Sequence, residues 1–125
     1  MRSSIVLVLL LLLAAACTRE PVENQARALG DREFAPERWA VASTAEREHM
    51  VASFLAKHPP DRLTTQQVKQ LLGEPTGYYD YDENLAYLIG PATVESQYGK
   101  ERMLVFITDK RTGNVEEVEL VPPLK

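Results

Sequence analysis

The distribution of apolar and polar residues divides the chain into four stretches. Residues 5–16 are apolar without interruption, whereas residues 18–40 are rich in charge and show no sustained helical or strand period. Residues 44–72 carry apolar side chains at helical spacing, and residues 85–121 contain runs in which apolar and polar positions alternate. The pattern therefore predicts a short apolar segment, a polar connection, helices and then strands.

Two helices are predicted in the middle of the chain. Residues 43–46 and 64–67 both have the spacing of a capping box, in which a hydroxyl and a Glu or Gln side chain satisfy the first free amides of a helix. A proline pair ends the first apolar stripe, and a glycine followed by a proline ends the second. We expect helices over 44–57 and about 65–72, with the buried stripes Met50, Val51, Phe54 and Leu55 in the first and Val68, Leu71 and Leu72 in the second.

Strands are predicted after the second helix, where the period changes. They lie near residues 78–81, 85–89, 102–108 and 115–121. Because only short connections join them, the sheet must be antiparallel, with one face on the helices and a more polar face outward. The predicted fold class is α+β: two N-terminal helices packed on a three- or four-stranded antiparallel sheet, in a domain over 41–125.

Residues 17–40 are interpreted as a tether between an anchor and this domain, because proline, glycine and charged residues interrupt any apolar period. Phe34 and Trp39 are the exceptions in it. Large aromatic side chains bury most of their surface in folded proteins, so we expect these two to pack back onto the domain rather than to bind a partner.

The N-terminus has the three parts of an export signal. Arg2 precedes the apolar run, and three alanines separate that run from Cys17. The run from Ile5 to Ala16 has only 12 residues, whereas a helix that spans a bilayer needs about 20. Residues 1–16 are therefore predicted to be a cleaved signal peptide.

Residues 13–17, Leu-Ala-Ala-Ala-Cys, resemble a bacterial lipobox. The resemblance implies that Cys17 becomes the first residue after cleavage and carries acyl chains, which anchor a protein stably once two are present. Ala14 stands where the usual pattern prefers leucine. The alternative is an ordinary signal peptide with an accidental cysteine after its cleavage site. Thr18, rather than aspartate, after the cysteine resembles the sorting signal of an outer-membrane lipoprotein, if the organism has an outer membrane.

Composition narrows the choice of partners. The chain has 14 Lys and Arg against 18 Asp and Glu, and loss of residues 1–16 would remove only Arg2 from that count. An acidic chain lacks the basic surface that nucleic acid requires, so no nucleic-acid partner is expected. The single cysteine excludes an intrachain disulfide, so packing alone must hold the domain.

The second helix and the strands together resemble a known domain. Residues 63–75, Leu-Thr-Thr-Gln-Gln-Val-Lys-Gln-Leu-Leu-Gly-Glu-Pro, followed by aromatic-rich strands and by residues 104–107 and 113–115, resemble the BamE/SmpA-like lipoprotein domain over about residues 60–121. Arg62-Leu63 replaces the Gly-Met that often precedes the first threonine of the motif. The resemblance implies a two-helix-plus-sheet fold, also similar to β-lactamase inhibitor proteins, and a role beside envelope protein assembly, but it transfers no partner-binding residue.

A search for chemistry finds no catalytic constellation. Residues 80–84 begin like a calcium loop, but Leu85 and Pro91 stand where that loop needs glycine and glutamate. His49 and His58 have no metal-ligand spacing, and no nucleophile stands near a base. We therefore expect no enzyme activity, no metal and no cofactor, with a polar turn at residues 80–84.

All five tyrosines lie between residues 78 and 98. Tyrosine is enriched at interfaces, although alternating tyrosines that fill the core face of a small sheet are at least as good an interpretation. Tyr78, Tyr79 and Tyr81 cannot all face inward from one strand, because neighbouring side chains point to opposite faces. We predict a partner surface at these three residues.

These observations together predict a lipid-anchored protein of the bacterial cell envelope, facing the periplasm from the outer membrane in a diderm organism. The expected role is a non-catalytic protein-interaction module, with an envelope protein as partner and the membrane bound through Cys17. The alternative is an inhibitor or ligand-binding lipoprotein that uses the outer face of the sheet.

Overall fold

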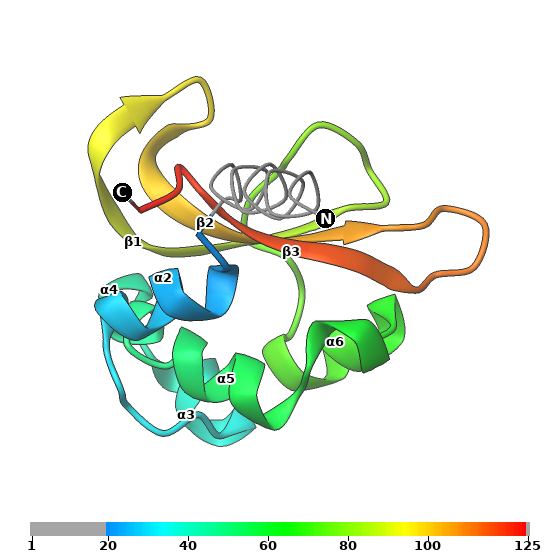
Figure 1. The fold of residues 1–125 in the computed structure, drawn as a ribbon, viewed down its shortest axis with the longest axis horizontal. Coiled ribbons are helices and arrows are strands. Elements are labelled where there is room, and N and C mark those ends of the chain that lie inside the picture. Colours follow the sequence, from blue (N-terminus) through cyan, green and yellow to red (C-terminus); the bar gives the residue numbers. More distant parts are fainter. Residues whose placement is uncertain (1–19, 125) are drawn as a thin grey trace, which may run out of the picture.

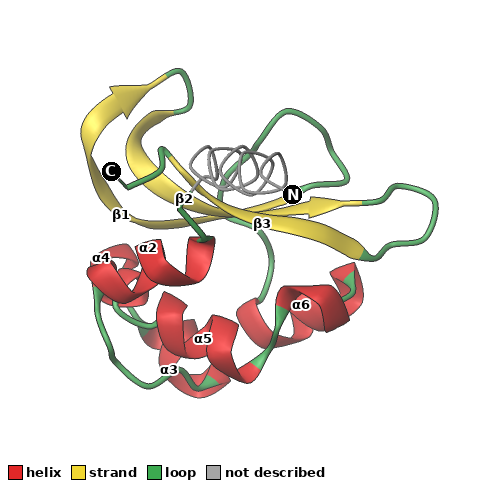
Figure 2. Cartoon of the chain, in the orientation of Figure 1, coloured by secondary structure: helices red, strands yellow, loops and turns green. Residues whose placement is uncertain are grey.

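A layer of helices packs on one face of an antiparallel sheet (Figures 1 and 2). The computed structural model describes residues 20–124, apart from the side chains of residues 92–94; the predicted signal peptide and Cys17 lie outside the described residues. In the described part, the order of elements is α2 (Val22–Leu29), α3 (Pro36–Val41), α4 (Thr44–Glu48), α5 (Val51–Lys57), the 3-10 helix η2 (Pro60–Arg62), α6 (Thr65–Leu72), β1 (Leu85–Ser96), β2 (Gly99–Thr108) and β3 (Val115–Val121). The sheet has the order β1-β2-β3 with both pairs antiparallel. The predicted α+β class is confirmed.

The domain begins earlier than the sequence predicted. Helices α2 and α3 occupy most of the stretch that was interpreted as a tether, and Ala26, Phe34 and Trp39 within it are buried. The prediction of a tether is therefore wrong from Val22 onward, because single buried residues, Ala26 of α2, Phe34 of the connection and Trp39 of α3, join this stretch to the core in place of a long apolar stripe. Phe34 and Trp39 pack onto the domain as expected.

The predicted first helix is two helices. The capping box at Ser43 is present and begins α4, but the helix is interrupted at His49 and Met50 before α5. The carbonyl of His49 accepts the amide of Arg32 at 2.9 Å, so the returning segment after α2 takes the acceptor that an unbroken helix would use. Gly30 approaches His49 so closely that an added Cβ would lie 2.9 Å from the His49 Cα.

Helix α6 agrees with its predicted bounds. Thr64 and Gln67 form the expected capping box, and Gly73 ends the helix at a positive φ of 81°. The helix start is also tied to the turn between β2 and β3, because the Thr65 amide and hydroxyl both donate to the Gly113 carbonyl, at 2.8 and 2.9 Å.

The predicted strand near 78–81 is absent from the described sheet. Residues 78–84 form a loop, and only Gly77 makes an isolated bridge, to Ala86 of β1. The other three strands are confirmed, although β1 runs beyond its predicted end at residue 89 to Ser96, with irregular register on both sides of Pro91.

The main core lies between the helices and the sheet. Its aromatic side chains meet edge to face, with ring centroids 5.0 Å apart for Phe34 and Phe54 and 5.9 Å apart for Phe54 and Phe106. Trp39 and Tyr87 continue this contact, at 6.4 Å. The two helices that replace the predicted tether therefore supply part of the core.

The outer face of the sheet is less polar than predicted. Ala86, Met103 and Val105 are buried there and form a second cluster, against which Tyr79, Leu88, Tyr98, Ile107 and Val121 pack. A polar outer face was expected because Glu117 and Glu119 alternate with apolar residues on β3. The chain between α6 and β1 crosses this side of the sheet, opposite the helices, and shields the cluster (Figure 1).

Candidate functional site

The predicted tyrosine surface lies on the loop before β1, which we call the tyrosine loop (residues 77–84). Both ends of this loop are fastened to the sheet. At one end the Gly77 amide donates to the Ala86 carbonyl at 3.0 Å. At the other end Asn84 donates to the Tyr79 carbonyl at 3.1 Å and accepts the Thr108 amide at 3.1 Å. The loop is therefore held at one end by its backbone and at the other by the Asn84 side chain, a geometry that suits a contact surface.

The middle of the loop is a tight turn. The Tyr81 amide donates to the Tyr79 carbonyl at 2.7 Å, and Asp80 has a positive φ of 58°. Aspartate tolerates this left-handed conformation better than most residues. The Tyr78 hydroxyl donates to the Asp80 carbonyl at 2.7 Å. The turn therefore points neighbouring tyrosines in different directions. The sequence had predicted the same divergence from the alternation of side chains along a strand over 78–81.

Tyr79 is the inward member of the three tyrosines. It is partly buried against the outer face, and its ring lies 4.9 Å from that of Tyr98. Burial, followed by the negative charges of Glu119, Asp80 and Glu117, raises the pKa of the Tyr79 hydroxyl. Tyr98 donates to the Asp80 carboxylate, and this bond is the main cause of its own raised pKa. Tyr79 and Tyr98 thus pack together on the outer face of the sheet and support the loop.

Tyr78 and Tyr81 are the outward members, with 57% and 66% of their surface exposed. They are two of the three exposed large hydrophobic residues of the described chain. With Asp80, Asp82, Glu83 and Lys110 they line a shallow hollow. The expectation that at least one of the three tyrosines is exposed is confirmed. Aromatic rings beside carboxylates suit contact with a basic, partly apolar protein surface.

The two histidines lie apart from this loop. His49 Nδ1 is 2.7 Å from the Leu29 carbonyl, whereas the His58 ring packs on Phe34 and Phe54. Among residues 20–124 no group of three or more His, Cys, Asp or Glu side chains is placed to hold a metal ion. Asp80 and Asp82 lie on the tyrosine loop, in the polar turn expected there.

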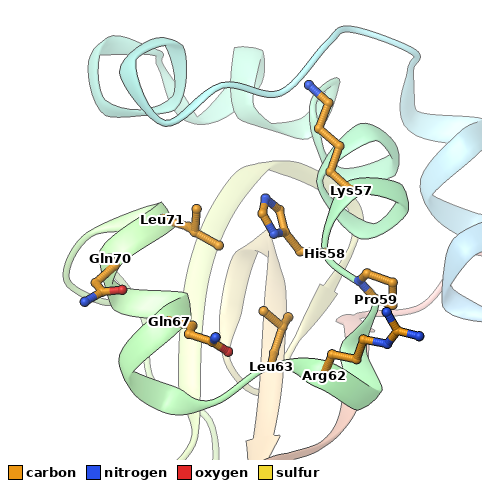
Figure 3. A pocket seen from close by; sticks show the side chains of 8 residues that line it. All are labelled: Lys57, His58, Pro59, Arg62, Leu63, Gln67, Gln70 and Leu71. Atoms are coloured by element: carbon orange, nitrogen blue, oxygen red, sulfur yellow. The ribbon is translucent and has the colours of Figure 1, made fainter.

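A groove between α5 and α6 was not predicted from the sequence (Figure 3). It has a volume of about 420 Å³. The lining residues, from the end of α5 to the last turn of α6, are Lys57, His58, Pro59, Arg62, Leu63, Gln67, Gln70 and Leu71. The lining residues come from α5, η2 and α6, so no single sequence motif predicts the groove. The nearest signal in the sequence is the pair of cations, Lys57 and Arg62, on either side of Pro59-Pro60.

Among residues 20–124, two buried side-chain atoms lack a hydrogen-bond partner, and neither lies in the groove or the tyrosine loop. They are Trp39 Nε1 and Arg102 Nε. The Arg102 guanidinium donates to the Pro122 carbonyl through another nitrogen, and Arg47 covers the Trp39 ring at 4.9 Å. These contacts belong to the packing of the core and the C-terminal segment.

Among the described residues, none of the helices has the length and apolar character needed to cross a bilayer. No family model, curated protein or solved structure matches the chain. The resemblance to BamE/SmpA-like domains therefore rests on the sequence motifs, and the candidate site rests on its own geometry.

Proposed function

We propose that the chain is a lipid-anchored, non-catalytic protein-interaction module of the bacterial cell envelope and that it binds an envelope protein through the tyrosine loop. The observation that carries the proposal is the exposure of Tyr78 and Tyr81 on a loop fastened to the sheet at both ends. Tyrosine supplies a large contact area and loses little side-chain entropy on binding, so a pre-ordered loop of this kind binds at low cost.

The anchor belongs to the same proposal. Cys17 lies outside the described residues, and the lipobox-like residues 13–17 are the reason to assign acyl chains to it. Only Thr18 to Pro21 separate Cys17 from the first residue of α2. Four residues reach at most about 14 Å when fully extended. The folded domain would therefore lie close to the membrane, and its partner would be a membrane protein or a protein held near the same surface.

A crosslinking pull-down from native membranes tests this function. We expect the acylated chain to recover an envelope protein, and we expect the Cys17→Ala variant to lose both the anchor and most of the recovered partner. A Tyr78→Ser/Tyr81→Ser variant should keep the anchor and lose the partner. Recovery of the same proteins by this double variant would remove the tyrosine loop from the proposal.

The inhibitor alternative uses the outer face of the sheet. The second cluster there is apolar, but Tyr79 and Tyr98 already pack over it. An inhibitor would therefore have to present the tyrosine loop rather than the strands. Co-purification of a soluble hydrolase in place of an envelope protein, in the same pull-down, would favour this alternative.

A further inference from the structure

The groove between α5 and α6 has the features of a second binding site. It lies on the helical side of the sheet, whereas the tyrosine loop lies on the opposite side (Figures 1 and 3). Its floor and walls mix apolar groups with polar ones. Leu63, Leu71 and Pro59 supply the apolar surface, and Gln67 and Gln70 supply amides from neighbouring turns of α6.

The charged side chains that line the groove are basic, whereas the chain as a whole is acidic. Lys57 and Arg62 line it together with His58, and no Asp or Glu is among the lining residues. The chain as a whole has a net charge of −4. A groove whose lining carries Arg62 and no carboxylate attracts negatively charged ligands and orients them as they approach.

Lys57 and Arg62 differ in whether their charged groups already have a partner. Lys57 Nζ lies 3.3 Å from a Glu33 carboxylate oxygen and 2.8 Å from the Phe34 carbonyl. Arg62 is exposed and makes no ion pair or side-chain hydrogen bond to the residues that the structure describes. Its planar guanidinium keeps all five donors, in a geometry that matches a carboxylate. Arg62 is thus the group best placed to bind an anion.

His58 is held in place at the side of the groove. Its ring packs against Phe54 with centroids 5.2 Å apart and against Phe34 at 6.1 Å and 90°. In Figure 3 the ring projects into the space between α5 and α6. A polar ring fixed by aromatic neighbours loses little entropy when a ligand binds.

The amides distinguish a peptide from a lipid surface. Gln67 Oε1 accepts the Thr64 amide at 3.0 Å as part of the helix cap, which leaves its NH₂ group as a donor. Gln70 forms no hydrogen bond through its side chain within the described residues, so it can both donate and accept, as a peptide backbone requires. A membrane surface is too flat to enter a groove between two helices, and it offers no repeating backbone groups.

We propose that this groove binds an extended acidic segment of a partner protein, with Arg62 holding a carboxylate and Gln67 and Gln70 pairing with the peptide backbone. The site is independent of the tyrosine loop, so failure of one proposal leaves the other intact. Apolar residues of the segment would contact Leu63 and Leu71.

The test is a fluorescence-anisotropy titration of the full chain in a non-ionic detergent. The probe is a fluorescein-labelled peptide, Gly-Glu-Leu-Glu-Ser-Glu-Leu-Gly, and the control probe has glutamine in place of each glutamate. We expect the glutamate peptide to bind about tenfold more tightly than the glutamine peptide at low salt, and added salt to reduce the difference. Arg62→Gln should weaken binding about fivefold, the upper end of the range for one exposed charge pair.

Lys69→Gln is the control, because Lys69 is an exposed cation of the neighbouring helix α6 that does not line the groove. It should leave the affinity unchanged, and both variants should keep the circular dichroism of the parent chain. Equal binding of the two peptides, or an equal loss in Arg62→Gln and Lys69→Gln, would overturn the proposal. Dihexanoyl phosphatidylserine, a soluble anionic lipid, is the competing ligand; tighter binding of this lipid than of the peptide, lost in Arg62→Gln, would assign the groove to a lipid instead.

Discussion

At the scale of a single residue, Tyr87 links the sheet to the end of α6. Its side chain is fully buried between the two layers, and its hydroxyl donates to the Gly73 carbonyl at 2.8 Å. Burial is the main cause of the raised pKa of this hydroxyl, followed by the nearby charge of Glu74. The hydroxyl therefore stays protonated and keeps its bond over the physiological pH range.

Tyr87→Phe should lower the free energy of unfolding by about 1 kcal/mol, because one buried hydrogen bond is lost while the ring remains. Urea unfolding followed by circular dichroism measures the change. Tyr78→Phe is the control, since its hydroxyl bond to Asp80 is exposed and water can replace it. An equal loss in both variants would show that the Tyr87 bond makes no special contribution.

Tyr79 and Tyr98 make stability depend on pH on the alkaline side. Both hydroxyls have a raised pKa in the folded chain, whereas an unfolded tyrosine ionises near pH 10. The unfolded chain therefore loses these protons first, so the contribution of these two hydroxyls to stability is fully present below about pH 10 and is lost as pH rises through the folded pKa values. Unfolding free energies at about pH 9 and about pH 11 measure the fall. Tyr98→Phe should make it smaller, and a fall of unchanged size would contradict the assignment.

At the scale of the element, helices α2 and α3 are the part of the fold that the sequence did not predict. Both are short, at 8 and 6 residues, so neither displays a sustained apolar period. Their place in the fold depends on Phe34 and Trp39, which were recognised as candidates for packing, and on the hydrogen bond from the Phe34 amide to the Ser53 hydroxyl at 2.9 Å. Such long-range contacts cannot be read from local patterns.

Phe34→Ala tests the assignment of this stretch to the core. Removal of a fully enclosed phenylalanine should reduce the free energy of unfolding by about 3–5 kcal/mol. Val41→Ala in the same stretch is the control, because Val41 is 87% exposed and its loss should cost less than about 0.5 kcal/mol. If residues 22–41 were a tether, chemical denaturation would find both variants as stable as the parent chain.

The remaining elements differ in whether local sequence signals or tertiary contacts determine them. Helix α6 and strands β2 and β3 were predictable, because capping residues, breakers and alternation lie within each segment. The interruption between α4 and α5 was not, since Arg32, far away in sequence, takes the His49 carbonyl. The segment 78–81, where a strand was expected, is a loop. Tyr79 packs on the sheet and Tyr78 and Tyr81 point to solvent, and the backbone of this segment does not pair with a strand.

At the scale of the whole molecule, the two sides of the sheet carry different surfaces. The tyrosine loop is acidic and aromatic, and the groove between α5 and α6 is basic and lined by amides. The first was anticipated by the concentration of tyrosines in one segment, but the second combines residues from three elements and required the folded chain. A module of this form can contact two partners, or two parts of one partner, at once.

The central claim is that the tyrosine loop contacts an envelope protein, and site-specific photocrosslinking in living cells tests it most directly. The photoreactive residue p-benzoylphenylalanine would replace Tyr81 in one variant and the exposed Val41, in the helical layer, in another. We expect one discrete adduct with an envelope protein from position 81 and none with that protein from position 41. The same adduct from both positions, or no adduct from position 81 in a normally anchored chain, would contradict the account.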